Sequence, residues 1–203
     1  MYKILLSIIL SIFLAGCGPH VENSKVKFPL GIQSKMSSSQ VAVVLNKKLK
    51  DESKNRYHKI ILQDSNELVV LSAGIPLGNE IFNGIDCDFF ENKIYHIRLS
   101  AQTGNEVSEQ FSSITSMIAF LKNAYGGIPD VSTLENAKYG KDIMNVTVAS
   151  FSNDTINVDI YSRYTEGYFY LELNYFDVPL LAKKAEQADL LKQQQATGTK
   201  RNL

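Results

Sequence analysis

The sequence has little of what most enzymes and nucleic-acid-binding proteins need. Its 203 residues include no tryptophan, and 21 Lys and Arg residues balance 21 Asp and Glu residues. That balance lacks the basic excess that binds nucleic acid. The sequence also contains no phosphate loop, dinucleotide fingerprint, nucleophile elbow or zinc-protease motif. Three histidines, His20, His58 and His96, are not spaced as zinc ligands. We therefore expect no catalytic residue, metal site, cofactor or nucleic-acid partner.

Cysteine is also scarce, since Cys17 and Cys87 are the whole complement. Two thiols are too few for a disulfide framework. Cys17 ends a leader in which Lys3 precedes an apolar run over residues 4–13. That run of about ten residues fits a signal peptide, and it is too short for a span of about 20 residues.

The end of this leader, Leu14-Ala15-Gly16-Cys17, resembles the lipobox of bacterial lipoproteins. The resemblance implies diacylglycerol on the Cys17 thiol, cleavage between Gly16 and Cys17, and often acylation of the new amino terminus. The alternative is a buried apolar N-terminal helix with an incidental cysteine. Two or three acyl chains anchor a protein stably. Position 18 holds Gly, whereas an Asp there would resemble an inner-membrane retention signal. In a host with two membranes, this favours a location in the outer membrane, facing the periplasm.

These features divide the chain into four parts. Residues 1–16 are the expected signal peptide, 17–27 a lipidated tether, 28–192 one domain, and 193–203 a disordered tail. The domain is expected to have halves at about 28–102 and 103–192. Its length is sufficient for a sizeable core.

Three helices are predicted. Ser37 and Gln40 have capping-box spacing at the start of a helix over residues 37–50, with Val41, Val44, Leu45 and Leu49 on one face. A second helix starts at about Glu109, with Ser108 as its expected cap, and Gly126-Gly127 end it. Its predicted apolar face is Phe111, Ile114, Met117, Ile118, Leu121 and Tyr125. A third helix begins at Pro179.

Alternating apolar residues predict strands near residues 59–63, 68–72, 85–90, 94–99, 144–148, 156–160 and 169–175. Residues 74–84, rich in Gly and Pro, are expected to form a loop or an irregular edge. The resulting fold class is α+β, an antiparallel sheet with helices on one face. The element order suggests two helix-plus-three-strand units in tandem, followed by a C-terminal helix.

The hairpin over residues 85–99 allows a register prediction. A three-residue loop over 91–93 pairs Asp88 with His96 and Cys87 with Ile97, which keeps apolar partners together and buries Cys87. A two-residue loop would mix the faces. In the favoured three-residue loop, Asn92 or Lys93 would take the left-handed position.

Residues 31–45 (GIQSKMSSSQVAVVL) resemble the helix start of small envelope lipoproteins of the SmpA/OmlA type and of the β-lactamase-inhibitor-like fold. Met36, Ser37 and Val41 match that pattern, whereas Lys35 stands where the family has Gly, and the expected ending after the helix is missing. The resemblance implies a small α+β scaffold that binds other envelope proteins.

Two surfaces are candidate sites. Tyr161, Tyr164, Tyr168 and Tyr170 are expected to form an exposed patch suited to a protein or glycan partner; the alternatives are ordinary strand composition or cover by the terminal helix. Asp88 and His96 could perform acid–base chemistry, or form a solvated ion pair of little energetic value. We thus expect a non-catalytic, membrane-anchored binding or scaffold domain. The alternatives are an envelope hydrolase using the Asp88/His96 face and a defence or exclusion lipoprotein encoded on a mobile element.

Overall fold

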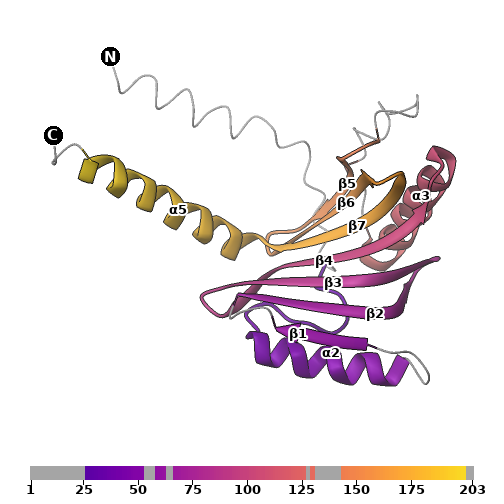
Figure 1. The fold of residues 1–203 in the computed structure, drawn as a ribbon, viewed down its shortest axis with the longest axis horizontal. Helices are drawn as coiled ribbons and strands as arrows, with labels where there is room; N and C mark the ends of the chain where they lie inside the picture. The colour runs from indigo at the N-terminus through magenta and orange to yellow at the C-terminus, as the bar shows by residue number, and fades with distance from the viewer. Residues whose placement is uncertain (1–25, 53–57, 63–65, 127–128, 131–142, 200–203) are drawn as a thin grey trace, which may run out of the picture.

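A computed structural model describes residues 26–52, 58–62, 66–126, 129–130 and 143–199. It shows an α+β fold, as the sequence predicts, in which a seven-stranded antiparallel sheet carries the helices (Figure 1). In chain order the elements are α2 (Ser38–Glu52), β1 (His58–Leu62), β2 (Glu67–Leu77), β3 (Glu80–Phe90), β4 (Lys93–Gly104), α3 (Val107–Tyr125), β5 (Val146–Ser152), β6 (Ile156–Thr165), β7 (Tyr168–Asp177) and α5 (Val178–Thr199).

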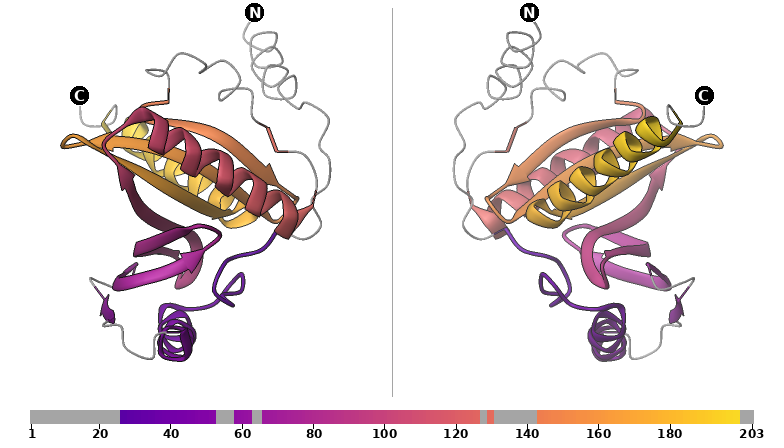
Figure 2. Two further views of the ribbon diagram at one scale, coloured as in Figure 1. Left: turned by 90° about the vertical axis from the view of Figure 1, so that its right-hand side faces the viewer. Right: turned by 90° about the vertical axis from the view of Figure 1, so that its left-hand side faces the viewer.

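The strand order is β1-β2-β3-β4-β7-β6-β5, so the two halves of the chain meet where β4 pairs with β7. Successive side chains along a strand point to opposite faces of the sheet. One face is apolar, and α2 and α3 pack on it in one shared core, α2 over the first half and α3 over the second (Figures 1 and 2). Residues from both halves, such as Leu99 and Leu173, are fully buried there. The opposite face is polar.

The start of α2 follows the predicted capping box. The backbone N–H of Ser37 donates to Gln40 Oε1 at 2.9 Å, and the N–H of Gln40 donates to Ser37 Oγ at 3.4 Å. Val41 and Leu45 are fully buried, and Leu49 nearly so. The helical periodicity of the apolar residues therefore places this helix correctly.

The start of α3 differs from the prediction. Ser108 lies inside the helix, and Glu106 is the N-cap. The Glu109 carboxylate accepts from the backbone N–H groups of Asn105 and Glu106, at 3.2 and 3.3 Å. Phe111, predicted to face the core, is 42% exposed, and Gln110 is buried instead. The buried face of α3 is continuous and consists of Gln110, Ile114, Met117, Leu121 and Tyr125. A pattern of apolar residues alone does not predict this face, because Gln110 is polar.

The predicted three-residue loop between β3 and β4 is wrong, although most of the predicted register is right. Asp88 pairs with His96 and Cys87 with Ile97, but Phe90 pairs with Lys93. The turn therefore contains only Glu91 and Asn92, with φ of 50° and 56°, as a two-residue hairpin turn requires. Tyr95 is an extra residue that forms a bulge in β4. Beyond the bulge, the pairs from Asp88–His96 onward keep the predicted register.

The segment over residues 74–84 is strand rather than loop. β2 continues to Leu77, and β3 begins at Glu80 after a tight turn. A register shift between Leu71 and Ile75 is the irregularity that the Gly and Pro content signals. Gly78 in the turn has φ of 61°, and a Cβ atom there would lie 3.1 Å from Phe120 Cγ.

Helix α5 leaves the end of β7 and projects beyond the sheet (Figure 1). Asp177 caps it, because its carboxylate accepts from the N–H of Leu180 at 3.0 Å. The helix continues to Thr199, into the segment predicted to be a disordered tail. At the other end Val26, predicted to lie in the tether, is buried in the core together with Phe28. Among the described residues, no helix has the length and apolarity needed to cross a membrane.

Candidate functional site

The sheet face opposite α2 and α3 gathers polar and aromatic side chains from four adjacent strands. We call it the polar face and define it by the outward residues of β3, β4, β7 and β6. The strand pairing places them on one side: Asp86, Asp88, His96, Arg98, Asn157, Asp159, Tyr161, Arg163, Tyr168, Tyr170, Glu172, Asn174 and Phe176. Within the described residues, α5 is the helix that borders this face, through its contacts beside the β3–β4 turn.

His96 lies near the centre of one row of the polar face. Its Nδ1 is 2.7 Å from Asp88 Oδ2, and its Nε2 is 3.1 Å from Asn174 Oδ1. Its ring stacks on Phe176, with centroids 4.6 Å apart and planes 8° from parallel. The hydrogen bond from His96 lowers the pKa of Asp88, against the opposing effect of partial burial. Both imidazole nitrogens and one ring face are therefore engaged within the protein.

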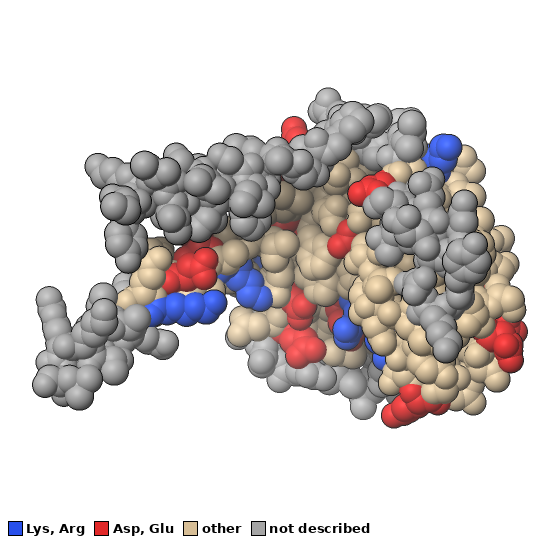
Figure 3. Space-filling view, turned by 90° about the horizontal axis from the view of Figure 1, so that it is seen from above, with Lys and Arg blue, Asp and Glu red and all other residues tan. Residues whose placement is uncertain are grey.

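The next row of the polar face carries a second ion pair. Arg98 Nε donates to Asp86 Oδ2 at 2.8 Å, and Asp86 lies directly opposite Arg98 in the β3–β4 register. Burial lowers the pKa of Arg98, but the hydrogen bond and charge of Asp86 outweigh this and leave the pKa raised. Figure 3 shows acidic and basic side chains intermixed over the surface it displays. The polar face itself carries both signs, because Arg98 pairs with Asp86 and Arg163 pairs with Glu172. Any partner of this face must therefore match a mixed charge pattern.

An arginine–tyrosine–glutamate cluster spans β6 and β7 on the polar face. Arg163 lies over the ring of Tyr170, with its Cζ 4.3 Å from the centroid. Its Nε donates to Glu172 Oε1 at 2.5 Å, and only 5% of Glu172 is exposed. Because the guanidinium has two partners, the cluster is held in one arrangement before any ligand arrives.

The four predicted site tyrosines do not share one surface. Tyr161, Tyr168 and Tyr170 face the polar side, and Tyr168 is 45% exposed. Tyr164 pairs directly with the buried Phe169, and the two ring centroids lie 4.7 Å apart. Tyr164 therefore belongs to the opposite side of the sheet, because it stands an odd number of residues from Tyr161.

Of the two cysteines, only Cys87 lies among the described residues. Gly16 and Cys17, the predicted cleavage and lipidation residues, lie outside the described residues. Cys87 is a buried free thiol, and burial together with the charges of Asp86 and Asp88 raises its pKa. Such a thiol has little nucleophilic character. Within the described ranges, no three His, Cys, Asp or Glu side chains come together as metal ligands.

Arg163 and Phe176 are site residues that the sequence reasoning did not single out. Arg163 could have been predicted from the sequence, because strand alternation places it on the same face as Tyr161. The stacking of Phe176 on His96 depends on the β4–β7 pairing, which joins distant parts of the chain. Comparison of the chain with protein-family models, curated proteins and solved structures gave no match.

Proposed function

We propose that this protein is a lipid-anchored bacterial envelope lipoprotein whose domain binds another envelope protein through the polar face, without catalysis. The anchor rests on the lipobox resemblance at residues 14–17, with lipid on Cys17. The binding role rests mainly on one observation, the fixed arginine–tyrosine–glutamate cluster of β6 and β7.

The composition of the polar face supports a protein partner. Tyrosine and arginine are enriched at protein interfaces and among the residues that contribute most to binding. Tyr168 and Tyr170 supply area and hydroxyl groups, and Arg163 is already oriented by its two contacts. A preorganised side chain loses less entropy on binding than a free one.

The arrangement around His96 favours binding over hydrolysis. A general base needs a nitrogen lone pair within reach of the substrate proton. His96 Nδ1 and Nε2 instead face Asp88 and Asn174 at hydrogen-bonding distance. A structural role for the Asp88–His96 contact is consistent with this arrangement, which supports binding over the alternative of an envelope hydrolase.

The proposed anchor and the buried start of the domain support binding close to the membrane. The sequence between Cys17 and the buried Val26 is short, so the domain would remain close to the lipid surface. Gly18 favours the outer membrane facing the periplasm in a host with two membranes. The expected partner is therefore another protein of the envelope, and a glycan is the alternative.

Crosslinking in intact cells tests the binding proposal. Tagged wild type, the triple variant Tyr161→Ala/Tyr168→Ala/Tyr170→Ala and the control Phe111→Ala would be crosslinked and recovered by their tags. Phe111 is an exposed aromatic residue on α3, on the other side of the sheet. We expect a protein partner with wild type and the control, and its loss with the triple variant.

Equal recovery of every partner with all three chains would contradict the role of the polar face. Circular dichroism and a melting curve would show whether the triple variant is folded. Recovery of polysaccharide in place of protein would favour the glycan alternative.

A further inference from the structure

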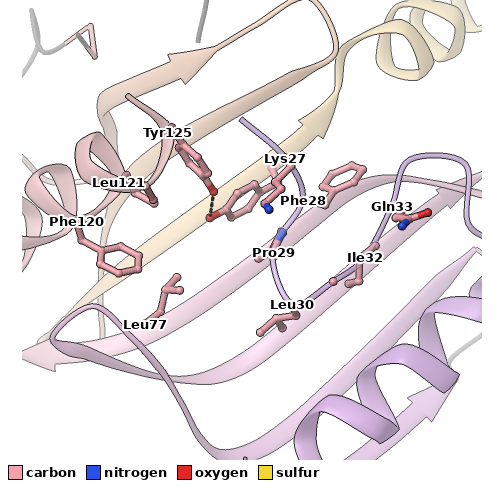
Figure 4. A pocket seen from close by; sticks show the side chains of 13 residues that line it. Lys27, Phe28, Pro29, Leu30, Ile32, Gln33, Leu77, Phe120, Leu121 and Tyr125 are labelled. Carbon is pink, nitrogen blue, oxygen red and sulfur yellow. Dashed lines mark hydrogen bonds between the residues drawn. The ribbon is translucent and has the colours of Figure 1, made fainter. Parts of the chain in front are cut away.

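A cavity of about 340 Å³ lies between the N-terminal segment over residues 27–33, the end of α3 and the β2–β3 turn (Figure 4). Most of its lining is apolar, with Phe28, Leu30, Leu77, Phe120 and Leu121 among the wall residues. Its volume falls in the lower part of the range of small-molecule sites, roughly 300–1,000 Å³. The cavity lies on the helix-covered side of the sheet, away from the polar face.

Two tyrosines, Tyr125 and Tyr175, contribute hydroxyl groups to the cavity lining, which also includes Lys27 and Gln33. The hydroxyl groups of Tyr125 and Tyr175 are 3.1 Å apart and share one hydrogen bond. Each hydroxyl carries one proton, so this bond uses only one of the two. Within the described residues, the second proton has no acceptor, although Tyr175 is almost completely buried. A buried donor without an acceptor is costly, and a bound ligand would remove that cost.

Both phenols remain protonated at neutral pH. Burial raises the pKa of Tyr125, and burial together with the neighbouring Tyr125 raises the pKa of Tyr175 well above its ordinary value. The free position is therefore a hydrogen-bond donor, and its complement is a ligand oxygen that accepts. A carbonyl or carboxylate oxygen meets that requirement.

The cavity lining combines polar groups with apolar wall residues. Lys27 is an exposed member of the lining, and Figure 4 shows it on the same side as the hydrogen-bonded tyrosines. Leu77 and Phe120 lie at the other side of the cavity in that view. No ion pair of Lys27 occurs within the described residues. Hydrogen-bonding and charged groups beside an apolar wall fit a molecule with an oxygen-bearing head and a hydrocarbon chain.

We propose that the cavity binds a single fatty-acyl chain. The hydrocarbon packs along Leu77 and Phe120, and the carbonyl or carboxylate oxygen accepts from the free tyrosine hydroxyl beside Lys27. The site is separate from the polar face, so it adds lipid binding to the proposed protein binding.

Two sources supply such a chain, either a free lipid of the bilayer or the lipid expected on Cys17. Nine residues lie between Cys17 and Lys27, and the ten Cα–Cα steps of an extended chain from one to the other span up to roughly 33 Å. The lipid of the anchor is therefore within covalent reach of the cavity.

Photoaffinity labelling with a photoactivatable palmitate tests the proposal. The full chain carrying Cys17→Ala, which has no attached lipid, would be irradiated with this probe, and the labelled peptides would be identified by mass spectrometry. We expect labelling within residues 27–33 and 120–125 that unlabelled palmitate displaces. Labelling elsewhere, or labelling that palmitate does not displace, would overturn the proposal.

Variants of α3 and β7 sharpen this test. Ala124→Trp fills the mouth of the cavity and should abolish the displaceable labelling, whereas Asn123→Trp, an exposed neighbour outside the lining, should preserve it. Tyr175→Phe removes a hydroxyl but keeps the ring, and it should weaken palmitate binding about two- to twelvefold, as for one hydrogen bond. Unchanged binding in both cavity variants, with folding verified by melting curves, would also overturn it.

The source of the lipid is decided by comparing two preparations. Lipidated wild type in phosphatidylcholine vesicles and the Cys17→Ala chain mixed with the same vesicles would receive the same probe. Lower labelling of wild type indicates that its own anchor occupies the cavity, whereas equal labelling indicates bilayer lipid. Both results support acyl binding, and the absence of displaceable labelling from both preparations refutes it.

Discussion

The rings of His96 and Phe176 stack across the junction between the two halves of the chain, with centroids 4.6 Å apart and planes 8° from parallel. His96 comes from β4 and Phe176 from β7. Asp88 and Asn174 occupy the two imidazole nitrogens. The histidine therefore joins three strands of the sheet, and its environment explains why it is fixed in place.

The Asp88–His96 contact predicts a pH-dependent contribution to stability. Since the pKa of Asp88 is lower in the folded chain than in the unfolded one, the folded state holds fewer protons. The contribution is present above the unfolded value, about 3.9, and disappears as pH falls through the folded value. Asp88→Asn should therefore be less stable than wild type at neutral pH, with a difference that narrows below about pH 4.

Urea unfolding of both chains over this pH range would measure the difference. Asp154→Asn, a change at an exposed acidic residue in the β5–β6 turn, is a suitable control. A difference between wild type and Asp88→Asn that stays constant with pH would contradict the assignment.

Arg163 is predicted to stabilise the domain by compensating the charge of Glu172. Glu172 is nearly buried, whereas the side chain of Arg163 is 37% exposed, so solvent screens part of the interaction. Arg163→Met should lower the free energy of unfolding by about 1–3 kcal/mol, because it leaves the carboxylate without its charged partner. The double variant Arg163→Met/Glu172→Gln should recover part of that loss, since it also removes the buried charge. Denaturant titration of the single and double variants provides the measurement, and additive losses would argue against the pair.

Gln110 is predicted to be structurally important although it is polar and buried. Its Nε2 donates to Ser162 Oγ at 2.8 Å and to the carbonyl oxygen of Tyr170 at 3.1 Å, and its Oε1 accepts from Thr103. Gln110→Leu removes these three hydrogen bonds and leaves Ser162 Oγ without its amide donor, although Thr103 keeps its hydrogen bond to the carbonyl oxygen of Phe169. The change should cost about 1–3 kcal/mol. The matched change Phe111→Leu at the exposed neighbouring position should alter stability by less than about 0.5 kcal/mol. Thermal and urea unfolding compare the two; similar losses would contradict this role.

The lipid anchor predicts a simple labelling result. Wild type expressed with radiolabelled palmitate should carry label and fractionate with membranes, whereas Cys17→Ala should do neither. Cys87→Ala is the control, because its buried thiol is not the predicted acceptor. Continued labelling of Cys17→Ala would show that the lipobox interpretation is wrong.

Local sequence patterns were sufficient for much of the fold. Alternation over β6 and β7 predicted which side chains face the core, because the strand period of two is a local property. The Ser37–Gln40 spacing predicted the start of α2 for the same reason. The pairing of Asp88 with His96 was also predictable, since the two strands are adjacent in sequence.

Other features needed the tertiary structure. The size of the β3–β4 turn was mispredicted because the prediction did not consider a bulge. A bulge shifts the pairing near the turn by one residue, but it leaves the same side chains buried along the rest of the strand. Ser108 was an incorrect cap because the carboxylate of Glu109 satisfies the preceding backbone N–H groups. Neither choice is marked by residue type alone.

By itself, the sequence determined the α+β class, the polarity of the two sheet faces and the expectation of lipid on Cys17, all of which depend on short-range patterns. Only the tertiary structure placed Phe176 against His96, separated Tyr164 from the other tyrosines and formed the cavity that Tyr175 lines. These arrangements depend on the β4–β7 pairing and on the packing of the N-terminal segment against α3. Such contacts join residues far apart in sequence, and local periodicity carries no information about which distant partner a strand or helix will choose.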